Sequence, residues 1–200
     1  SAMSHAINFV NPQEIKRVDF SEGVTAYSMS STPADCVRFG TLALNDKFDL
    51  VLSGINYGVN VGQDIVYSGT VAAVFEAARM GIKGIAFSTF PHCQKEAAEY
   101  FDMVYDFIVS QNLFEETLIY NVNIPEKVKD IRITRQGSHY FSDGFVHDGG
   151  DIYHQEGEPM PDVCPNDLNR DTVAILNETI SVTPLLATRT DMRVFEKYKR

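Results

Sequence analysis

Three short apolar runs alternate with two helical segments, and this order constrains the fold more than any other feature. The runs span residues 49–53, 84–88 and 118–122, and glycine, proline or polar residues bound them. Short buried runs of this kind are typical of parallel strands. The segments 70–80 and 95–111 repeat apolar residues at helical spacing. The pattern predicts an α/β fold: a three-layer α/β/α sandwich with a Rossmann-like, mainly parallel sheet and right-handed crossovers.

Smaller elements are predicted around this core. Pro33 is expected to begin a helix that Thr32 caps and that reaches Leu44. Residues 136–168 are rich in Gly, His, Asp and Pro with little periodicity, which predicts a β-hairpin appendage. The remaining predicted elements are strands at 24–28, 130–135 and 179–183 and helices at 171–176 and 191–198. We expect one domain over residues 1–200, with a core at about 20–135 and 170–185 and a C-terminal helix at about 189–200.

A long loop rich in glycine and asparagine, residues 54–69, follows the first apolar run. Ligands of open α/β sheets gather at the carboxyl ends of the strands, where this loop lies. Asn56 and Asn60 offer amide oxygens that suit Mg²⁺ or Mn²⁺, and residues 68–70 open a helix whose free N–H groups suit a phosphate. A solvated loop with an ordinary helix cap explains the composition equally well. The spacing fits neither a Walker A loop nor a dinucleotide fingerprint.

Six segments, taken in order along the chain, resemble the SurE nucleotidase family. The loop 53–70 is similar to the family's S-G-x-N-x-G-x-N-x-G-x-D-x-x-x-S-G-T signature. The other five segments are residues 1–7 (S-A-x-G-H-x-I in the family), 32–36 (T-P-x-D-C), 121–125 (N-[IV]-N-[VI]-P), 133–135 ([VF]-T-R) and 181–185 (S-[IV]-T-P-[LI]). A single motif would be weak support, whereas an ordered series from Ser1 to Leu185 is specific.

The resemblance implies a divalent-metal phosphomonoesterase that hydrolyses nucleoside 5′- and 3′-monophosphates. By the same resemblance, Ser1 and Asn56 are metal ligands, for Mg²⁺ or Mn²⁺. It also implies that the hairpin and the C-terminal helix join subunits into a homo-dimer or homo-tetramer. The positions matched to the phosphate or its surroundings are Ser68, Gly69, Thr70, Asn60 and Asp64.

The sequence departs from the family at one place that matters for catalysis. The family begins with a strand that ends in Asn-Asp-Asp-Gly, and its two aspartates bind the metal. No Asp-Asp-Gly follows a strand here, because Asp143-Gly144 and Asp148-Gly149 lie in the irregular appendage. We therefore expect that an opening strand–helix–strand unit of roughly 35–40 residues is missing. The catalytic residues stay unassigned, and a catalytically inactive anion-binding or assembly module is the alternative function.

Composition excludes several classes of partner. Acidic residues outnumber basic ones by 27 to 17, for a net charge of −10. This balance argues against binding to a nucleic-acid polymer, which needs a basic face. No run approaches the roughly 20 apolar residues of a membrane helix, and no signal peptide is visible, so a cytoplasmic protein without membrane contact is expected.

The histidines and cysteines give little sign of a site of their own. His5 is expected to make a structural hydrogen bond rather than to act in catalysis. The other four histidines lie in loops or in the appendage and have no helical metal spacing. Cys36, Cys93 and Cys164 are far apart, which argues against a disulfide framework or a zinc site. Cys36 is expected to be a small buried residue of the predicted helix.

Overall fold

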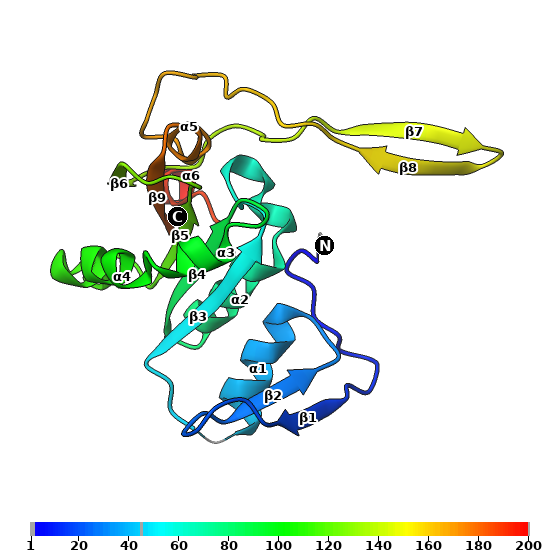
Figure 1. The fold of residues 1–200 in the computed structure, drawn as a ribbon, viewed down its shortest axis with the longest axis vertical. Helices are drawn as coiled ribbons and strands as arrows, with labels where there is room; N and C mark the ends of the chain where they lie inside the picture. Colours follow the sequence, from blue (N-terminus) through cyan, green and yellow to red (C-terminus); the bar gives the residue numbers. More distant parts are fainter. Residues whose placement is uncertain (1–2, 45, 200) are drawn as a thin grey trace.

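The protein is built on a five-stranded sheet, seen here in a computed structural model that describes residues 3–44 and 46–199. The strands lie in the order β3, β4, β5, β9, β6 (Figure 1). All neighbours are parallel except β5 and β9, which pair antiparallel. The mainly parallel sheet predicted from the sequence is confirmed. The strand bounds are β3 (Leu50–Tyr57), β4 (Lys83–Thr89), β5 (Ile119–Ile124), β6 (Asp130–Ile133) and β9 (Thr179–Leu185).

Helices cover both faces of this sheet, as the predicted three-layer arrangement requires. On β4, Ile85 and Phe87 pack in the cluster that includes α4 (Phe101–Ser110). The residue between them, Ala86, packs in the cluster that includes α2 (Gly69–Arg79). Successive residues of a strand point to opposite faces, so α2 and α4 lie on opposite sides. The other helices are α1 (Pro33–Ala43), α3 (Gln94–Ala98), α5 (Asp171–Leu176) and α6 (Met192–Tyr198), with short 3₁₀ helices η1 (Gly62–Tyr67) and η2 (Leu113–Glu115).

The two consecutive crossovers have opposite hands, which corrects the prediction that both are right-handed. β3, β4 and β5 are parallel and follow one another across the sheet. Their connections pass on opposite faces, because α2 joins β3 to β4 and α4 lies between β4 and β5. Connections that advance in one direction on opposite faces cannot share a hand. The apolar face of β5 (Tyr120, Val122) requires the large side chains of α4, whereas its other face carries Asn121 and Asn123.

Several boundaries differ from the prediction for identifiable reasons. Strand β3 continues to Tyr57, because Asn56 and Tyr57 pair with Ser88 and Thr89 of β4 beyond a register shift. The second half of the predicted loop forms η1. The predicted helix 95–111 is divided into α3 and α4 by a tight turn, in which the Tyr100 backbone N–H donates to the Ala97 carbonyl. The strand predicted at 24–28 is present as β2 (Ala26–Met29), and it pairs in a small hairpin with β1 (Ile15–Val18), a strand that the sequence analysis does not predict.

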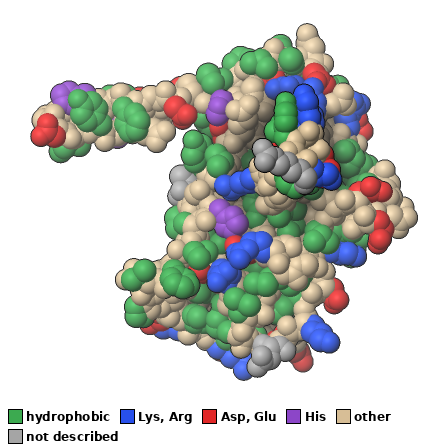
Figure 2. Space-filling view, turned by 180° about the vertical axis from the view of Figure 1, so that it is seen from behind, with side chains coloured by type: hydrophobic (Ala, Val, Ile, Leu, Met, Phe, Trp, Pro, Cys, Tyr) green, Lys and Arg blue, Asp and Glu red, His purple; other side chains and the backbone are tan. Residues whose placement is uncertain are grey.

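A long hairpin formed by β7 (Gly144–Gly149) and β8 (Ile152–Glu156) projects from the body of the protein (Figure 1). Every residue of these two strands is exposed, and hydrophobic side chains lie along the projection in the rear view (Figure 2). The hairpin and the final helix are both present where the sequence predicts them. None of the helices in the described residues is both long enough and apolar enough to span a membrane.

Candidate functional site

A pocket of about 480 Å³ lies at the carboxyl end of β3, beside the start of α2. Residues on both sides of the 3₁₀ helix η1, and residues within it, line this pocket. Of the residues singled out from the sequence, those that line it are Asn56, Asn60, Asp64, Ser68, Gly69 and Thr70. Ser1, the other predicted metal ligand, lies outside the described residues. The tertiary structure thus brings the amide loop and the helix start into one cavity.

The side chain of Asn56 is presented to this pocket by an irregularity in β3. The pairing of β3 with β4 shifts between Ser53 and Asn56. Gly54 lies within the shift with φ of +127°, and a Cβ there would overlap the carbonyl oxygen of Phe87, so only glycine fits. The Asn56 amide nitrogen Nδ2 donates to the Gly58 carbonyl at 2.8 Å. The amide oxygen Oδ1 is therefore the atom that remains to bind a cation.

The start of α2 has the features of an anion site. Ser68 caps the helix, and its hydroxyl accepts a hydrogen bond from the Val71 backbone N–H at 3.1 Å. The backbone N–H groups of Gly69 and Thr70 come first in the helix and have no partner within it. The first turn carries no acidic residue that would neutralise the positive end of the helix dipole. A Cβ on Gly69 would come within 3.1 Å of the Pro33 ring, so this glycine allows α1 and α2 to approach.

Aromatic side chains that the sequence analysis missed form much of the remaining wall. Tyr57 and Tyr67 line the pocket and are 54% and 53% exposed. Tyr140 and Phe141 line it from the appendage, with their ring centroids 4.9 Å apart. Burial raises the pKa of the Tyr140 phenol, so the ring stays neutral. Tyr140 and Phe141 lie in residues 136–168, where no periodicity marks them, and they are far from the loop in the sequence.

Asp64 connects this aromatic wall to the loop and does not act as a free acid or base. Its carboxylate accepts hydrogen bonds from the backbone N–H groups of Tyr140 at 2.7 Å and Phe141 at 3.1 Å. The His139 ring nitrogen Nδ1 lies 2.8 Å from the same carboxylate. A carboxylate with three such partners is committed to structure. Asp64 therefore holds the aromatic wall of the pocket against the loop.

Asp171 holds the loop at Gly62, the first residue of η1, from a fully buried position. Its carboxylate accepts backbone N–H groups from Gly62 at 2.9 Å, Gly137 at 2.7 Å and Thr172 at 2.7 Å. Burial raises the pKa of this carboxyl, whereas the three hydrogen bonds act in the opposite direction. Asp171 thus joins Gly62, at the start of η1, to Gly137, in the segment that also carries Tyr140.

The donor set fits one part of a divalent-metal site. The Asn56 oxygen is a hard neutral ligand of the type that Mg²⁺ and Mn²⁺ accept. Within residues 3–44 and 46–199, no three His, Cys, Asp or Glu side chains converge where they could share a metal ion. Among the described residues that line the pocket, Asp64 is the one with an acidic side chain. Its carboxylate already accepts hydrogen bonds from two backbone N–H groups. The carboxylate ligands that such metals prefer have no counterpart among the described residues.

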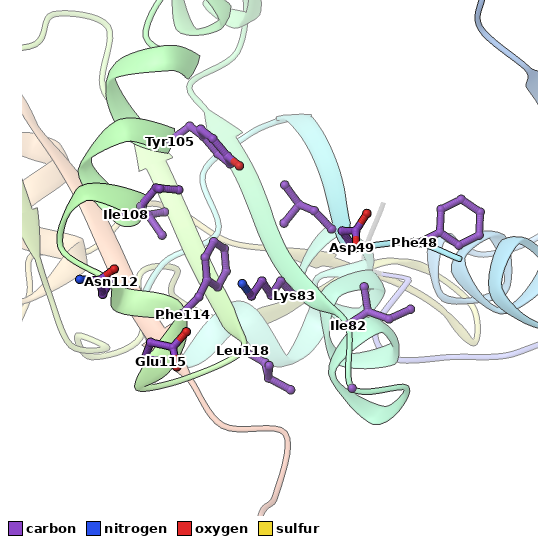
Figure 3. A pocket seen from close by; sticks show the side chains of 13 residues that line it. Phe48, Asp49, Ile82, Lys83, Tyr105, Ile108, Asn112, Phe114, Glu115 and Leu118 are labelled. Atoms are coloured by element: carbon purple, nitrogen blue, oxygen red, sulfur yellow. The ribbon is translucent and has the colours of Figure 1, made fainter. Parts of the chain in front are cut away.

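A second cavity of about 450 Å³ lies at the opposite end of β3 and β4 (Figure 3). Lys83 extends over the Phe114 ring, with Nζ 5.2 Å from the ring centroid. Asp49 lines this second cavity, not the pocket that contains Asp64. Asp49 directly precedes β3 and so lies at the end of this strand away from the pocket that contains Asp64.

Two expectations about single residues have opposite outcomes. The structural role of His5 is confirmed, since its Nε2 lies 2.7 Å from the carboxylate of Glu76, which is only 2% exposed. The expected burial of Cys36 is wrong, because this side chain is exposed. Helix α1 buries Ala34 and Asp35, and Cys36 lies on the outward side of the same turn.

Comparisons with known proteins identify the family of this chain. The family described as "Survival protein SurE" matches residues 1–143. A 5′-nucleotidase SurE from Microcystis aeruginosa is 36% identical, over 100% of this chain and 82% of the relative. A 5′-nucleotidase SurE from Thermosipho africanus is 35% identical, over 92% of this chain and 76% of the relative. The crystal structure of the SurE protein from Aquifex aeolicus superposes with a TM-score of 0.77, at 33% identity, over 98% of this chain and 82% of that one. This chain belongs to the SurE family.

Proposed function

We propose that this protein is a divalent-metal-dependent phosphomonoesterase that hydrolyses nucleoside 5′- and 3′-monophosphates to nucleoside and phosphate. One observation carries the proposal: the Asn56 side chain, the start of α2 and an aromatic wall line the same pocket. A cation ligand beside an anion site suits a metal-bound phosphate, and aromatic rings suit a nucleobase. Family membership adds that relatives of which this chain covers 82% and 76% are named 5′-nucleotidases.

Each part of the pocket has a separate task in this proposal. The N–H groups of Gly69 and Thr70 hold the non-bridging phosphate oxygens, where charge must be stabilised during transfer. Asn56 would supply one neutral oxygen ligand to the cation. When bound, the divalent cation supplies Lewis-acid polarisation of the phosphoryl group. The rings of Tyr57, Tyr67 and Phe141 cover the nucleoside. We assign the nucleophile and the carboxylate ligands to none of the described residues.

Phosphate release from a panel of 5′- and 3′-nucleoside monophosphates tests the function. The assay is run with Mn²⁺, Mg²⁺ or EDTA, on this chain and on the protein at its full encoded length. We expect metal-dependent release from nucleotides by the full-length protein and none in EDTA. Release by neither folded protein would contradict the proposal and favour the anion-binding module.

Replacing Asn56 by Ala is expected to weaken Mn²⁺ binding by about tenfold, because one oxygen ligand is lost. Isothermal titration of the full-length protein with Mn²⁺ measures the effect. Asn177→Ala is the matched control, since the Asn177 side chain also donates to a backbone carbonyl at 2.8 Å but lies outside the pocket. Equal Mn²⁺ affinity in wild type and Asn56→Ala would remove Asn56 from the metal site.

Replacing Ser68 by Ala is expected to lower both stability and phosphate affinity. The lost cap costs about 1 kcal/mol of unfolding free energy. Thr32→Ala is the control, because Thr32 caps α1 through the same 3.1 Å hydrogen bond and does not line the pocket. Urea unfolding should show a loss at least as large in Thr32→Ala, because the Thr32 hydroxyl also donates to the Ala6 carbonyl at 2.8 Å. Inhibition by inorganic phosphate should nevertheless weaken only in Ser68→Ala. An equal change in phosphate inhibition in both variants would argue against an anion site at α2.

We propose further that the protein forms a homo-dimer or homo-tetramer through its projecting hairpin and C-terminal helix. Phe145 and Ile152 on the hairpin are 74% and 66% exposed, and Phe195 and Tyr198 on α6 are 50% and 69% exposed. Large apolar side chains on a projecting element typically mark a contact surface. Light scattering after size exclusion should give a mass of two or four chains, and Phe145→Asp should reduce it. A monomeric wild type would contradict this assembly.

A further inference from the structure

One face of the sheet changes from apolar to polar along its strands, beneath the pocket. At one end, Ala86 of β4 and Ile119 of β5 pack against α2. On the same face, Ser88 follows Ala86 along β4, and Asn121 and then Asn123 follow Ile119 along β5. All three polar side chains are 0% exposed. Buried polar groups are costly unless they make hydrogen bonds, so their partners show what they do.

The partner of all three is one residue of the pocket loop. The amide nitrogens of Asn121 and Asn123 both donate to the Asn60 backbone carbonyl, at 2.7 and 2.8 Å. The Asn60 backbone N–H donates to Asn123 Oδ1 at 2.8 Å. The Asn60 side-chain nitrogen Nδ2 donates to Ser88 Oγ at 2.6 Å. These four bonds fix both the backbone and the side chain of Asn60, and they leave its Oδ1 as the free polar atom at the pocket wall.

The arrangement is not optimised for stability. Asn121 Oδ1 is buried and has no hydrogen-bond partner among the described residues, and neither has Ser181 Oγ on the adjacent strand β9. A buried oxygen without a partner is destabilising, and an apolar side chain at either position would avoid that cost. Ser88, Asn121 and Asn123 are therefore explained by the loop they hold and not by the packing of the core.

We propose that Ser88, Asn121 and Asn123, the amide clamp, are positioning residues that hold Asn60 and the loop 58–62 in the geometry needed to bind and turn over the substrate. The inference rests on the proposed function for its activity readout. The clamp acts through Asn60 and does not touch the substrate. Asn56 depends on the same loop, because it donates to Gly58, so a displaced loop also misplaces the metal ligand.

Two variants test the clamp, and a third controls for the loss of a buried hydrogen bond. Asn123→Ala removes the bonds to the Asn60 backbone, and Ser88→Ala removes only the bond to its side chain and is the milder change if Asn123→Ala fails to fold. Thr183→Val is the control: Thr183 is 1% exposed and lies opposite Asn121 in the sheet, and its hydroxyl lies 2.8 Å from that of Thr134 and is not bonded to Asn60. The full-length protein is used throughout.

The first readout is amide hydrogen exchange of residues 58–62, which needs no activity. We expect exchange to rise at least tenfold in Asn123→Ala and to stay at the wild-type rate in Thr183→Val. The second readout is kinetics with a nucleoside monophosphate and Mn²⁺. We expect kcat/KM to fall by about tenfold to a hundredfold in Asn123→Ala, and by a smaller factor in Ser88→Ala, with Thr183→Val near wild type.

The outcomes separate the clamp from the function. Unchanged exchange of residues 58–62 in both Asn123→Ala and Ser88→Ala would overturn the clamp, as would an equal loss of kcat/KM in Thr183→Val. A wild-type protein that releases no phosphate would overturn the proposed function, and the exchange data alone would then decide whether the clamp holds the loop.

Discussion

Replacing Gly62 by Ala should lower the free energy of unfolding by about 3 kcal/mol and abolish most of the activity. Gly62 begins η1 with φ of +60°, a region that costs a residue with a side chain about 1 kcal/mol. A Cβ there would also overlap the carbonyl oxygen of Ser138, a backbone atom that cannot rotate away. The segment carrying Tyr140 would have to move, and overpacking of this kind costs about 1–3 kcal/mol more.

Gly81→Ala is the matched control for this prediction. Gly81 has φ of +73° and nothing within 4 Å of the position of an added Cβ. It therefore carries the same conformational cost without the collision, and we expect a loss of about 1 kcal/mol with normal kcat/KM. Urea unfolding and nucleotide hydrolysis compare the two. Equal losses of stability in both variants would show that the contact with Ser138 is not a constraint.

Replacing Asp171 by Asn should cost about 2 kcal/mol of stability and loosen the pocket loop selectively. Asp171 Oδ1 accepts the N–H groups of Gly137 and Thr172, and Oδ2 accepts that of Gly62. An asparagine retains the first oxygen, but its amide nitrogen would face the Gly62 N–H, donor against donor. Leaving a buried N–H unsatisfied costs about 1–3 kcal/mol. We expect faster hydrogen exchange at Gly62 and a loss of kcat/KM of about tenfold or more.

Asp162→Asn provides the comparison for Asp171→Asn. Asp162 is 6% exposed and accepts backbone N–H groups from Ser138 and Cys164, but it makes no bond to the loop at Gly62. Both variants should unfold at lower urea concentrations than the wild type. Only Asp171→Asn should speed exchange of the Gly62 amide. If Asp162→Asn speeds that exchange equally, the effect is a general loosening and Asp171 has no special hold on the loop.

The order of the main elements and the starts of α1 and α2 could be read from the sequence because local physics decides them. Pro33 begins α1 with Thr32 as its cap, and Ser68 caps α2, as expected from residue chemistry at helix starts. The apolar runs became β3, β4 and β5. Strands β4 and β5 are buried, as a short apolar run predicts, whereas β3 is the edge strand and has no buried residue, which corrects the expected burial of the first run. The family signature placed Asn56, Asn60 and residues 68–70 near one site, and these residues line one pocket.

What the sequence left open depends on contacts between distant residues. Tyr140 and Phe141 reach the pocket only because Asp64, more than seventy positions earlier, binds their backbone. The hands of the two crossovers depend on which face of the sheet each connecting helix covers, and only the packing of α2 and α4 shows this. The clamp on Asn60 joins residues of β4 and β5 through side-chain amides. Local sequence determined which segments become helices and strands, and tertiary structure decided which of their polar groups meet, because hydrogen-bond partners are chosen by distance in space.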